Sequence, residues 1–169
     1  MKMSRIDIDE MLHCLFTMKE CNNNKPYYKI FKLVHENNEN VIEIFNKNFD
    51  FNVSYTDEQI ENMLQVIFNG MIAGKEGIKL IYILYIIKVS KVINDRYKCE
   101  TCIINTLKDI FERHRSFIND KGGFENFGIL FSKDDKEDDK NKTILTRNMI
   151  VLGCAVASSL LLGVFLTRS

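Results

Sequence analysis

The segment Ile78 to Ile93, with the sequence IKLIYILYIIKVSKVI, is apolar at nearly every position. A helix that is apolar on all sides must be surrounded by other helices, so this segment predicts a central helix. A β-strand is the competing interpretation because of the many β-branched residues, but about sixteen residues is long for a strand. A membrane span is disfavoured, because Lys79, Lys88 and Lys91 interrupt a run that is already too short. We therefore expect an all-α fold.

A second apolar segment, Met149 to Leu166 (MIVLGCAVASSLLLGVFL), contains 18 residues and no charge. As a helix it would span roughly 27 Å, which matches the hydrocarbon core of a thin bilayer. Arg147 and Arg168 flank the segment and would lie at the two membrane surfaces. We therefore expect a transmembrane tail anchor over residues 149–167. A buried C-terminal core helix is the alternative, although a core helix usually has some polar face over this length.

A strongly charged run precedes the second apolar segment. Lys133 to Lys142, with the sequence KDDKEDDKNK, has nine charged residues in ten. Such a run cannot be buried, and it predicts a solvated linker or, alternatively, an exposed helix face. The chain is thus expected to divide into a helical domain (1–132), a charged linker (133–148) and the anchor (149–167).

The N-terminal sequence MKMSRIDIDEM has no apolar core of the kind found in signal peptides, so we expect no secretory signal. A tail inserted after synthesis would leave the helical domain facing the cytosol. The five cysteines, at positions 14, 21, 99, 102 and 154, would then be thiols.

Helical periodicity of apolar residues organises the rest of the domain. Ile8, Met11, Leu12 and Leu15 are spaced to form one helix face, and Thr56 with Gln59 forms a capping box. Further helices are predicted over residues 4–20, 27–48 with an interruption at 36–40, 56 to about 68, 103–117 and, as a short helix, 124–131. Pro26 is expected in the first turn of the second of these. The 103–117 helix is expected to stop at the Gly122–Gly123 pair, because glycine favours the left-handed conformation that ends a helix. Six or seven helices would surround the hydrophobic one.

The composition and motifs exclude several classes of function. The chain has 23 Lys and Arg against 23 Asp and Glu, so its net charge of +0 argues against nucleic acid as the main partner. The histidines, at positions 13, 35 and 114, fall on separate predicted helices and suggest no metal site. A single Cys-x-x-Cys, Cys99 to Cys102, is weak evidence for zinc or redox chemistry. No nucleotide-binding or hydrolase motif is present. We expect no enzymatic activity, no cofactor and no metal.

Two local motifs, within an all-helical chain that has a central apolar helix and an apolar tail, resemble the Bcl-2 family of apoptosis regulators. Ile118 to Phe127 (INDKGGFENF) is similar to the BH2 motif, with Phe124 after Gly122 and Gly123 where the family usually has tryptophan. The BH1 region lacks the usual Asn-Trp-Gly-Arg, and Gly77 to Leu80 looks like the abbreviated helix start of the poxviral Bcl-2-like inhibitors.

The resemblance implies a Bcl-2-like helical bundle with a hydrophobic groove that binds BH3 helices of pro-apoptotic partners, such as Bim-, Bak- or Bax-like proteins. Lys79 would pair with the aspartate of the BH3 helix. The apolar lining of the groove would consist of Ile42, Phe45, Phe49, Met63, Ile67, Met71, Tyr82 and Ile83. For each of these residues, plain core packing is the alternative role, as is a solvated surface position for Lys79.

The resemblance also implies a direction of action. The segment from Tyr27 to Asn48 lacks the Leu-xxx-Gly-Asp signature of a BH3 helix, which favours a pro-survival role over a killer role. We expect a viral inhibitor of host-cell apoptosis, anchored in the mitochondrial outer membrane or, as the other candidate, the endoplasmic reticulum. The alternatives are a Bak-like effector that permeabilises membranes and a tail-anchored helical adaptor without a BH3 groove.

Overall fold

The computed structural model describes residues 7–36, 39–48, 54–73 and 77–126, and these residues form helices joined by short connections. The helices are α1 (Ile8–Thr17), α2 (Tyr28–His35), α3 (Glu39–Asn48), α4 (Asp57–Ile72), α5 (Leu80–Tyr97), α6 (Glu100–Arg113), α7 (Arg115–Asp120) and the 3-10 turn η1 (Phe124–Asn126). No strand occurs in the described part of the chain. The prediction of an all-α class is therefore confirmed, and the strand interpretation of the apolar run is wrong.

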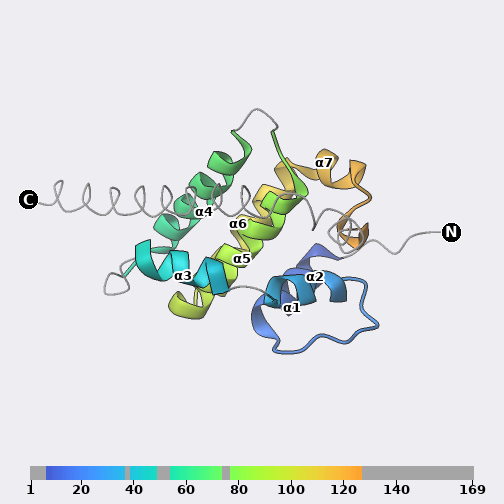
Figure 1. Cartoon of the computed structure of the whole chain (residues 1–169), viewed down its shortest axis with the longest axis horizontal. Coiled ribbons are helices and arrows are strands. Elements are labelled where there is room, and N and C mark those ends of the chain that lie inside the picture. The colour runs from blue at the N-terminus through green and yellow to red at the C-terminus, as the bar shows by residue number, and fades with distance from the viewer. Residues whose placement is uncertain (1–6, 37–38, 49–53, 74–76, 127–169) are drawn as a thin grey trace, which may run out of the picture.

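The helix α5 lies at the centre of the bundle, where it contacts α1, α2, α3, α4 and α6 (Figure 1). Its buried side chains lie on every side of the helix, as an all-round apolar sequence requires. The apolar ones with no solvent exposure are Ile83, Ile86, Ile87, Val89 and Ile93. The central helix predicted from the apolar run is confirmed, and it continues four residues beyond Ile93 to Tyr97.

The helices α1 and α4 each begin at a capping residue, and α1 begins at Ile8 instead of at the predicted residue 4. The Asp7 side chain accepts hydrogen bonds from the backbone N–H groups of Asp9 and Glu10, at 2.9 and 3.3 Å. In the predicted capping box, Thr56 Oγ1 accepts from Gln59 N at 3.2 Å and Gln59 Oε1 accepts from Thr56 N at 2.8 Å. These bonds satisfy N–H groups that the first turn of a helix leaves without partners. The predicted apolar faces of both helices pack into the core.

Two of the predicted helices are each divided in the structure. Residues 27–48 form α2 and α3 separately, and α2 begins at Tyr28, two residues after Pro26 instead of around it. The predicted 103–117 helix breaks at His114, whose backbone leaves the helical conformation at φ −111° and ψ 22°. The ring of His114 packs edge-on against Phe68 of α4, with 5.4 Å between ring centroids. No glycine or proline marks the break, and the contact with Phe68 lies at the same residue.

The end of α7 forms the two hydrogen bonds of a Schellman motif. Gly123 N–H donates to Ile118 O at 2.9 Å, and Gly122 N–H donates to Asn119 O at 3.0 Å. Both glycines have positive φ, +91° at Gly122 and +75° at Gly123. The prediction of a helix that ends at this Gly-Gly pair is confirmed. Phe124 then packs into the core.

Several predictions concern parts of the chain outside the described residues. These are the charged linker at 133–148, the anchor at 149–167 and the part of the 124–131 helix beyond residue 126. Among the helices that the structure describes, none is both long enough and apolar enough to cross a membrane.

Candidate functional site

Most of the predicted groove residues on α4 and α5 belong to the hydrophobic core. Met63, Ile67 and Met71 follow one another at four-residue spacing on α4, and each is at most 1% exposed. On α5, Ile83 is fully buried and Tyr82 is nearly so, and this burial raises the pKa of the Tyr82 hydroxyl. These five side chains are at most 7% exposed in this conformation, so they occupy core positions, the alternative role stated for each of them. A groove that used them would have to form by the separation of neighbouring helices.

The helix α3 carries the predicted groove residue that does reach the surface. Ile42 is 42% exposed, and it is one of two large apolar side chains exposed among the described residues. The helix packs against α5, and Arg96 of α5 donates to Asn46 Oδ1 of α3 at 3.3 Å. Phe45 belongs to α3, but its side chain lies outside the described part of the structure, as does the whole of Phe49.

Lys79 lies at the start of the central helix, as the residue before its first turn. Its backbone is extended, and its carbonyl accepts from Tyr82 N–H at 3.1 Å. The side chain is half-buried. A helix N-terminus carries a partial positive charge, which adds to that of the ammonium group. The position is therefore suited to an acidic side chain of a partner, although it is well separated in sequence from the exposed Ile42.

The BH2-like residues, Gly122, Gly123 and Phe124, serve the closure of the fold. The Phe124 ring meets the Phe111 ring of α6 edge-on, with centroids 5.1 Å apart. The left-handed conformation of the two glycines turns the chain so that this aromatic ring reaches the core. The structure thus places these three residues together after α7 and gives them a packing role.

Lys88 is a feature that the sequence interpretation did not assign. This lysine lies on the central helix with 8% exposure, and its Nζ donates to Glu36 O at 3.1 Å. Glu36 is the C-cap of α2, so the ammonium group meets the negative end of that helix. The available signal in the sequence was a lysine in the middle of the apolar run, because a buried charge requires a partner.

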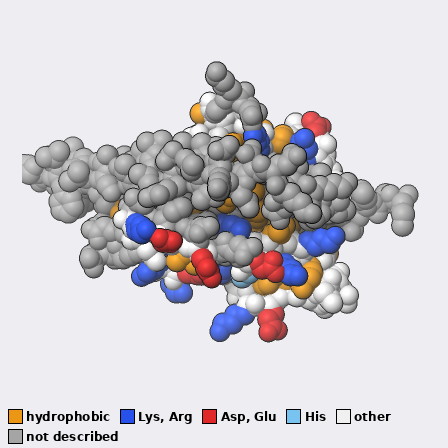
Figure 2. Space-filling view, in the orientation of Figure 1, with side chains coloured by type: hydrophobic (Ala, Val, Ile, Leu, Met, Phe, Trp, Pro, Cys, Tyr) orange, Lys and Arg blue, Asp and Glu red, His pale blue; other side chains and the backbone are white. Residues whose placement is uncertain are grey.

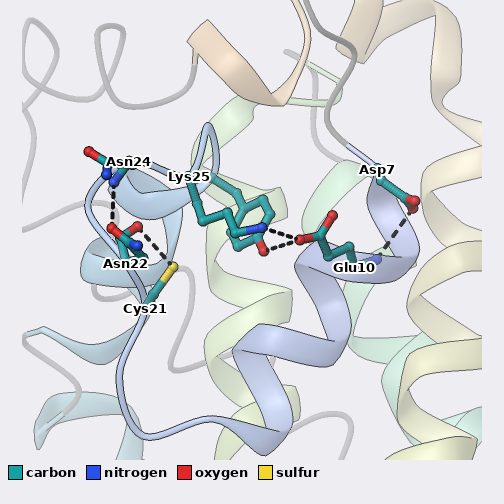
Figure 3. A network of polar contacts seen from close by, with 7 residues as sticks. Asp7, Glu10, Cys21, Asn22, Asn24 and Lys25 are labelled. Carbon is teal, nitrogen blue, oxygen red and sulfur yellow. Dashed lines mark hydrogen bonds and ion pairs between the residues drawn. The ribbon is translucent and has the colours of Figure 1, made fainter.

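A polar network joins α1 to the segment that leads into α2 (Figure 3). Glu10 Oε1 accepts from Lys25 Nζ and from the Tyr27 hydroxyl, both at 2.8 Å. These two hydrogen bonds lower the pKa of the Glu10 carboxyl. Burial and the bond to Glu10 raise the pKa of Tyr27, whose ring is in the core. The network holds the α1–α2 connection in place, and the carboxylate of Glu10 is paired with the ammonium group of Lys25.

The Cys99–Cys102 pair has the character of structural thiols. Burial raises the pKa of Cys99 to about 11, and it raises that of Cys102 as well. Cys102 Sγ donates to Asp57 O of α4 at 3.3 Å. A metal ligand or nucleophile needs the thiolate, which these surroundings disfavour.

The histidines each have a local contact on a different part of the bundle. His13 lies 3.9 Å from Glu100, His35 Nδ1 lies 2.8 Å from Phe31 O, and His114 packs on Phe68. Within the described ranges, no group of three or more His, Cys, Asp or Glu residues could hold a metal ion.

The surface charges are mixed in sign. Basic and acidic side chains alternate over the described part of the face shown in Figure 2. Ion pairs among the described residues include Lys47 with Glu43 at 2.7 Å and Lys108 with Asp9. Comparison with known proteins adds no relative, since no protein family, curated protein or solved structure matches this chain.

Proposed function

We propose that this chain is a pro-survival Bcl-2-like protein, which sequesters BH3 helices of pro-apoptotic proteins and so inhibits mitochondrial apoptosis. The observation that carries the proposal is the central position of α5, which five other helices surround. The Gly122–Gly123 turn supports it, because it brings Phe124 into the core at the place where the BH2 motif has its aromatic residue.

The binding step is the insertion of an amphipathic helix alongside α3, α4 and the start of α5. The exposed Ile42 offers the first apolar contact, and Lys79 with the N-terminal end of α5 attracts the aspartate of the BH3 helix. Lysine provides a point charge where arginine provides a planar fork, so the charge recognition here is less directional.

Because Met63, Ile67 and Met71 are buried, a partner helix binds only after α4 and its neighbours separate. These side chains leave the core packing between α4 and its neighbours and repack against the BH3 helix. Methionine suits this exchange, because its flexible thioether adapts to different surroundings. The affinity for a partner is then reduced by the free energy that opening requires.

Calorimetric titration of residues 1–140 with a panel of BH3 peptides tests the proposal, with the full chain in detergent as a second sample. We expect at least one peptide to bind more tightly than about 10 μM, which corresponds to roughly −7 kcal/mol. Binding weaker than this for every peptide would contradict the proposal.

The variant Lys79→Glu reverses the charge at the proposed acid-binding position. We expect it to weaken peptide binding about tenfold, equivalent to about 1.4 kcal/mol. Lys29→Glu is the matched control, since it makes the same charge change at an exposed position of α2. Equal affinities for the two variants would show that Lys79 does not meet the acid of the partner.

The proposed location is the mitochondrial outer membrane, through the apolar segment 149–166. Deletion of residues 149–169 is expected to release the protein into the cytosol of transfected cells, as measured by fractionation. Continued mitochondrial localisation of the shortened protein would contradict the anchor.

A further inference from the structure

Two hydroxyl side chains precede α4 in a part of the chain that is not helical. These are Ser54 and Thr56, and both are exposed. A hydroxyl outside a helix can enter the cleft of a modifying enzyme without the loss of backbone hydrogen bonds, whereas a helical one requires local unfolding. The other serine and threonine side chains in the described ranges all belong to helices, namely Thr17, Ser90, Thr101, Thr106 and Ser116.

The capping box distinguishes the two accessible hydroxyls. Thr56 Oγ1 accepts from Gln59 N at 3.2 Å, and the extended backbone of Thr56, with φ −74° and ψ 161°, forms the N-cap of α4. A change at this oxygen would disturb the start of the helix. Ser54 lies two residues earlier, outside the capping box, so its hydroxyl can be modified while α4 stays capped.

Acidic side chains follow Ser54 at a short and fixed spacing. Asp57 is the third residue after it and Glu58 is the fourth, and both are exposed. Because α4 begins at Asp57, the chain between Ser54 and this first acid is not helical and can extend across the substrate cleft of an enzyme. Protein serine kinases with a basic cleft select an acid at the third position after the acceptor, through charge complementarity.

We propose that Ser54 is a phosphorylation site for an acid-directed protein serine kinase, which recognises Asp57. In the transfer, Ser54 Oγ forms a bond to the γ-phosphorus of ATP, and the bond between that phosphorus and the oxygen that bridges to the β-phosphate breaks. ADP leaves with the electron pair of the broken bond, and the serine proton passes to the catalytic aspartate of the kinase. The proposal does not depend on the function proposed above.

The ring of Tyr55 holds this segment against the end of the central helix. It meets the Tyr97 ring edge-on, with 5.5 Å between centroids. Lys98 directly follows Tyr97 and is exposed. A phosphoserine carries a charge of about −1.5 to −2 at pH 7 and offers three acceptor oxygens. We expect the phosphate to pair with the Lys98 ammonium group, which would fasten the start of α4 to the end of α5.

The test uses the full chain in dodecyl maltoside with casein kinase II, ATP and Mg²⁺. The parent for all samples carries Ser132→Ala, because Ser132 also precedes acidic residues in the sequence. Trypsin releases residues 48–75 as one peptide, and its fragmentation in a mass spectrometer distinguishes Ser54 from Tyr55 and Thr56. We expect phosphate on Ser54. Ser54→Ala should abolish the phosphate in this peptide, whereas Thr56→Asn, which keeps an N-cap residue, should retain it.

The position of the phosphate decides whether the site is correct. Ser54→Ala changes an exposed side chain outside any helix, so the loss of phosphate in this variant reports the acceptor and not the fold. A chain without phosphate on Ser54 would overturn the proposal. Faster phosphorylation of Thr56, or of the helical Thr101 or Ser116, would overturn it as well.

A charge variant tests the recognition of Asp57. Asp57→Asn keeps the shape of the side chain and removes its charge. We expect it to lower the initial rate of phosphorylation about tenfold, as for the loss of one charge-assisted hydrogen bond. Asp120→Asn is the matched control, since it makes the same change at an exposed acid of α7 and should leave the rate unchanged. Equal rates for the two variants would overturn the role of the acid.

The phosphate group itself reports its partner. The second pKa of phosphoserine is about 6, and phosphorus NMR follows it in this detergent, which contains no phosphorus. Lys98→Ala removes the proposed cation and should raise that pKa by about half a unit relative to the phosphorylated parent. Lys121→Ala, at an exposed lysine after α7, should leave the pKa unchanged. Equal values in both variants would overturn the contact between the phosphate and the end of α5.

Discussion

Replacement of Gly122 by alanine tests the closure of the fold at the BH2-like motif. Gly122 has φ +91°, and a Cβ built on it would lie 2.6 Å from Asn126 Nδ2, which is closer than two such atoms approach. Asn126 would have to move, and its hydrogen bond to Lys121 O at 3.1 Å would be lost. Gly77 provides the matched control, because it has φ +69° but a Cβ there would meet no atom within 4 Å.

The expected costs follow from these two environments. An L-residue in the left-handed conformation costs about 1–2 kcal/mol, and alanine recovers about 0.4–1 kcal/mol by restricting the unfolded chain. Gly77→Ala should therefore destabilise the protein by about 0.5–1 kcal/mol. Gly122→Ala adds the displaced side chain and a lost hydrogen bond worth about 1 kcal/mol, so its total is about 2 kcal/mol.

Urea denaturation followed by far-ultraviolet circular dichroism measures both variants against the parent chain. The difference in unfolding free energy between Gly122→Ala and Gly77→Ala is expected to be at least about 1 kcal/mol, with an unchanged denaturant dependence. Equal costs for the two variants would refute the reasoning, since they would mean that the contact with Asn126 contributes nothing and that only the backbone conformation matters.

Three further perturbations test other parts of the bundle. Thr56→Ala removes one bond of the capping box and should cost about 1 kcal/mol in urea denaturation, whereas Thr56→Ser should keep most of the stability. Burial lowers the pKa of His114 below its usual 6.5, so the unfolded chain binds more protons at this residue than the folded chain does. The free energy of unfolding should therefore fall as the pH drops below about 6.5, and it should fall less in His114→Phe. Lys88→Met keeps the packing of the side-chain stem and removes a buried charge, whereas Lys88→Ala also leaves a cavity. The loss of unfolding free energy should therefore be at least about 2 kcal/mol smaller for Lys88→Met than for Lys88→Ala. Similar losses for both variants would instead assign the effect to the bond with Glu36 O.

The sequence predicted the helices that are marked by a pattern of neighbouring residues. The central helix followed from the apolar run, α4 from its capping box, and the end of α7 from two adjacent glycines. The break at His114 was not predictable in this way, because nothing in the neighbouring sequence disfavours a helix. His114 contacts Phe68, which is 46 positions away in the chain, and a local pattern contains no information about such a contact.

The candidate site was less predictable than the fold, for a reason that applies to Met63, Ile67 and Met71. Apolar residues at four-residue spacing on a helix have the same pattern whether they face the core or line a groove. Burial therefore had to come from the structure, and it places them in the core.

The closed core gives the proposed groove a thermodynamic requirement that an open groove would not have. Opening exposes the buried faces of α4 and α5, at a cost of about 25 cal/mol for each Å² of apolar surface. A partner helix must cover at least this surface, and it must also supply the acidic group that Lys79 attracts. Polar helices fail the first condition, and apolar helices without an acid lose the charge interaction. Because each 1.4 kcal/mol of opening weakens binding tenfold, the proposed site would select for strongly amphipathic helices with a well-placed aspartate.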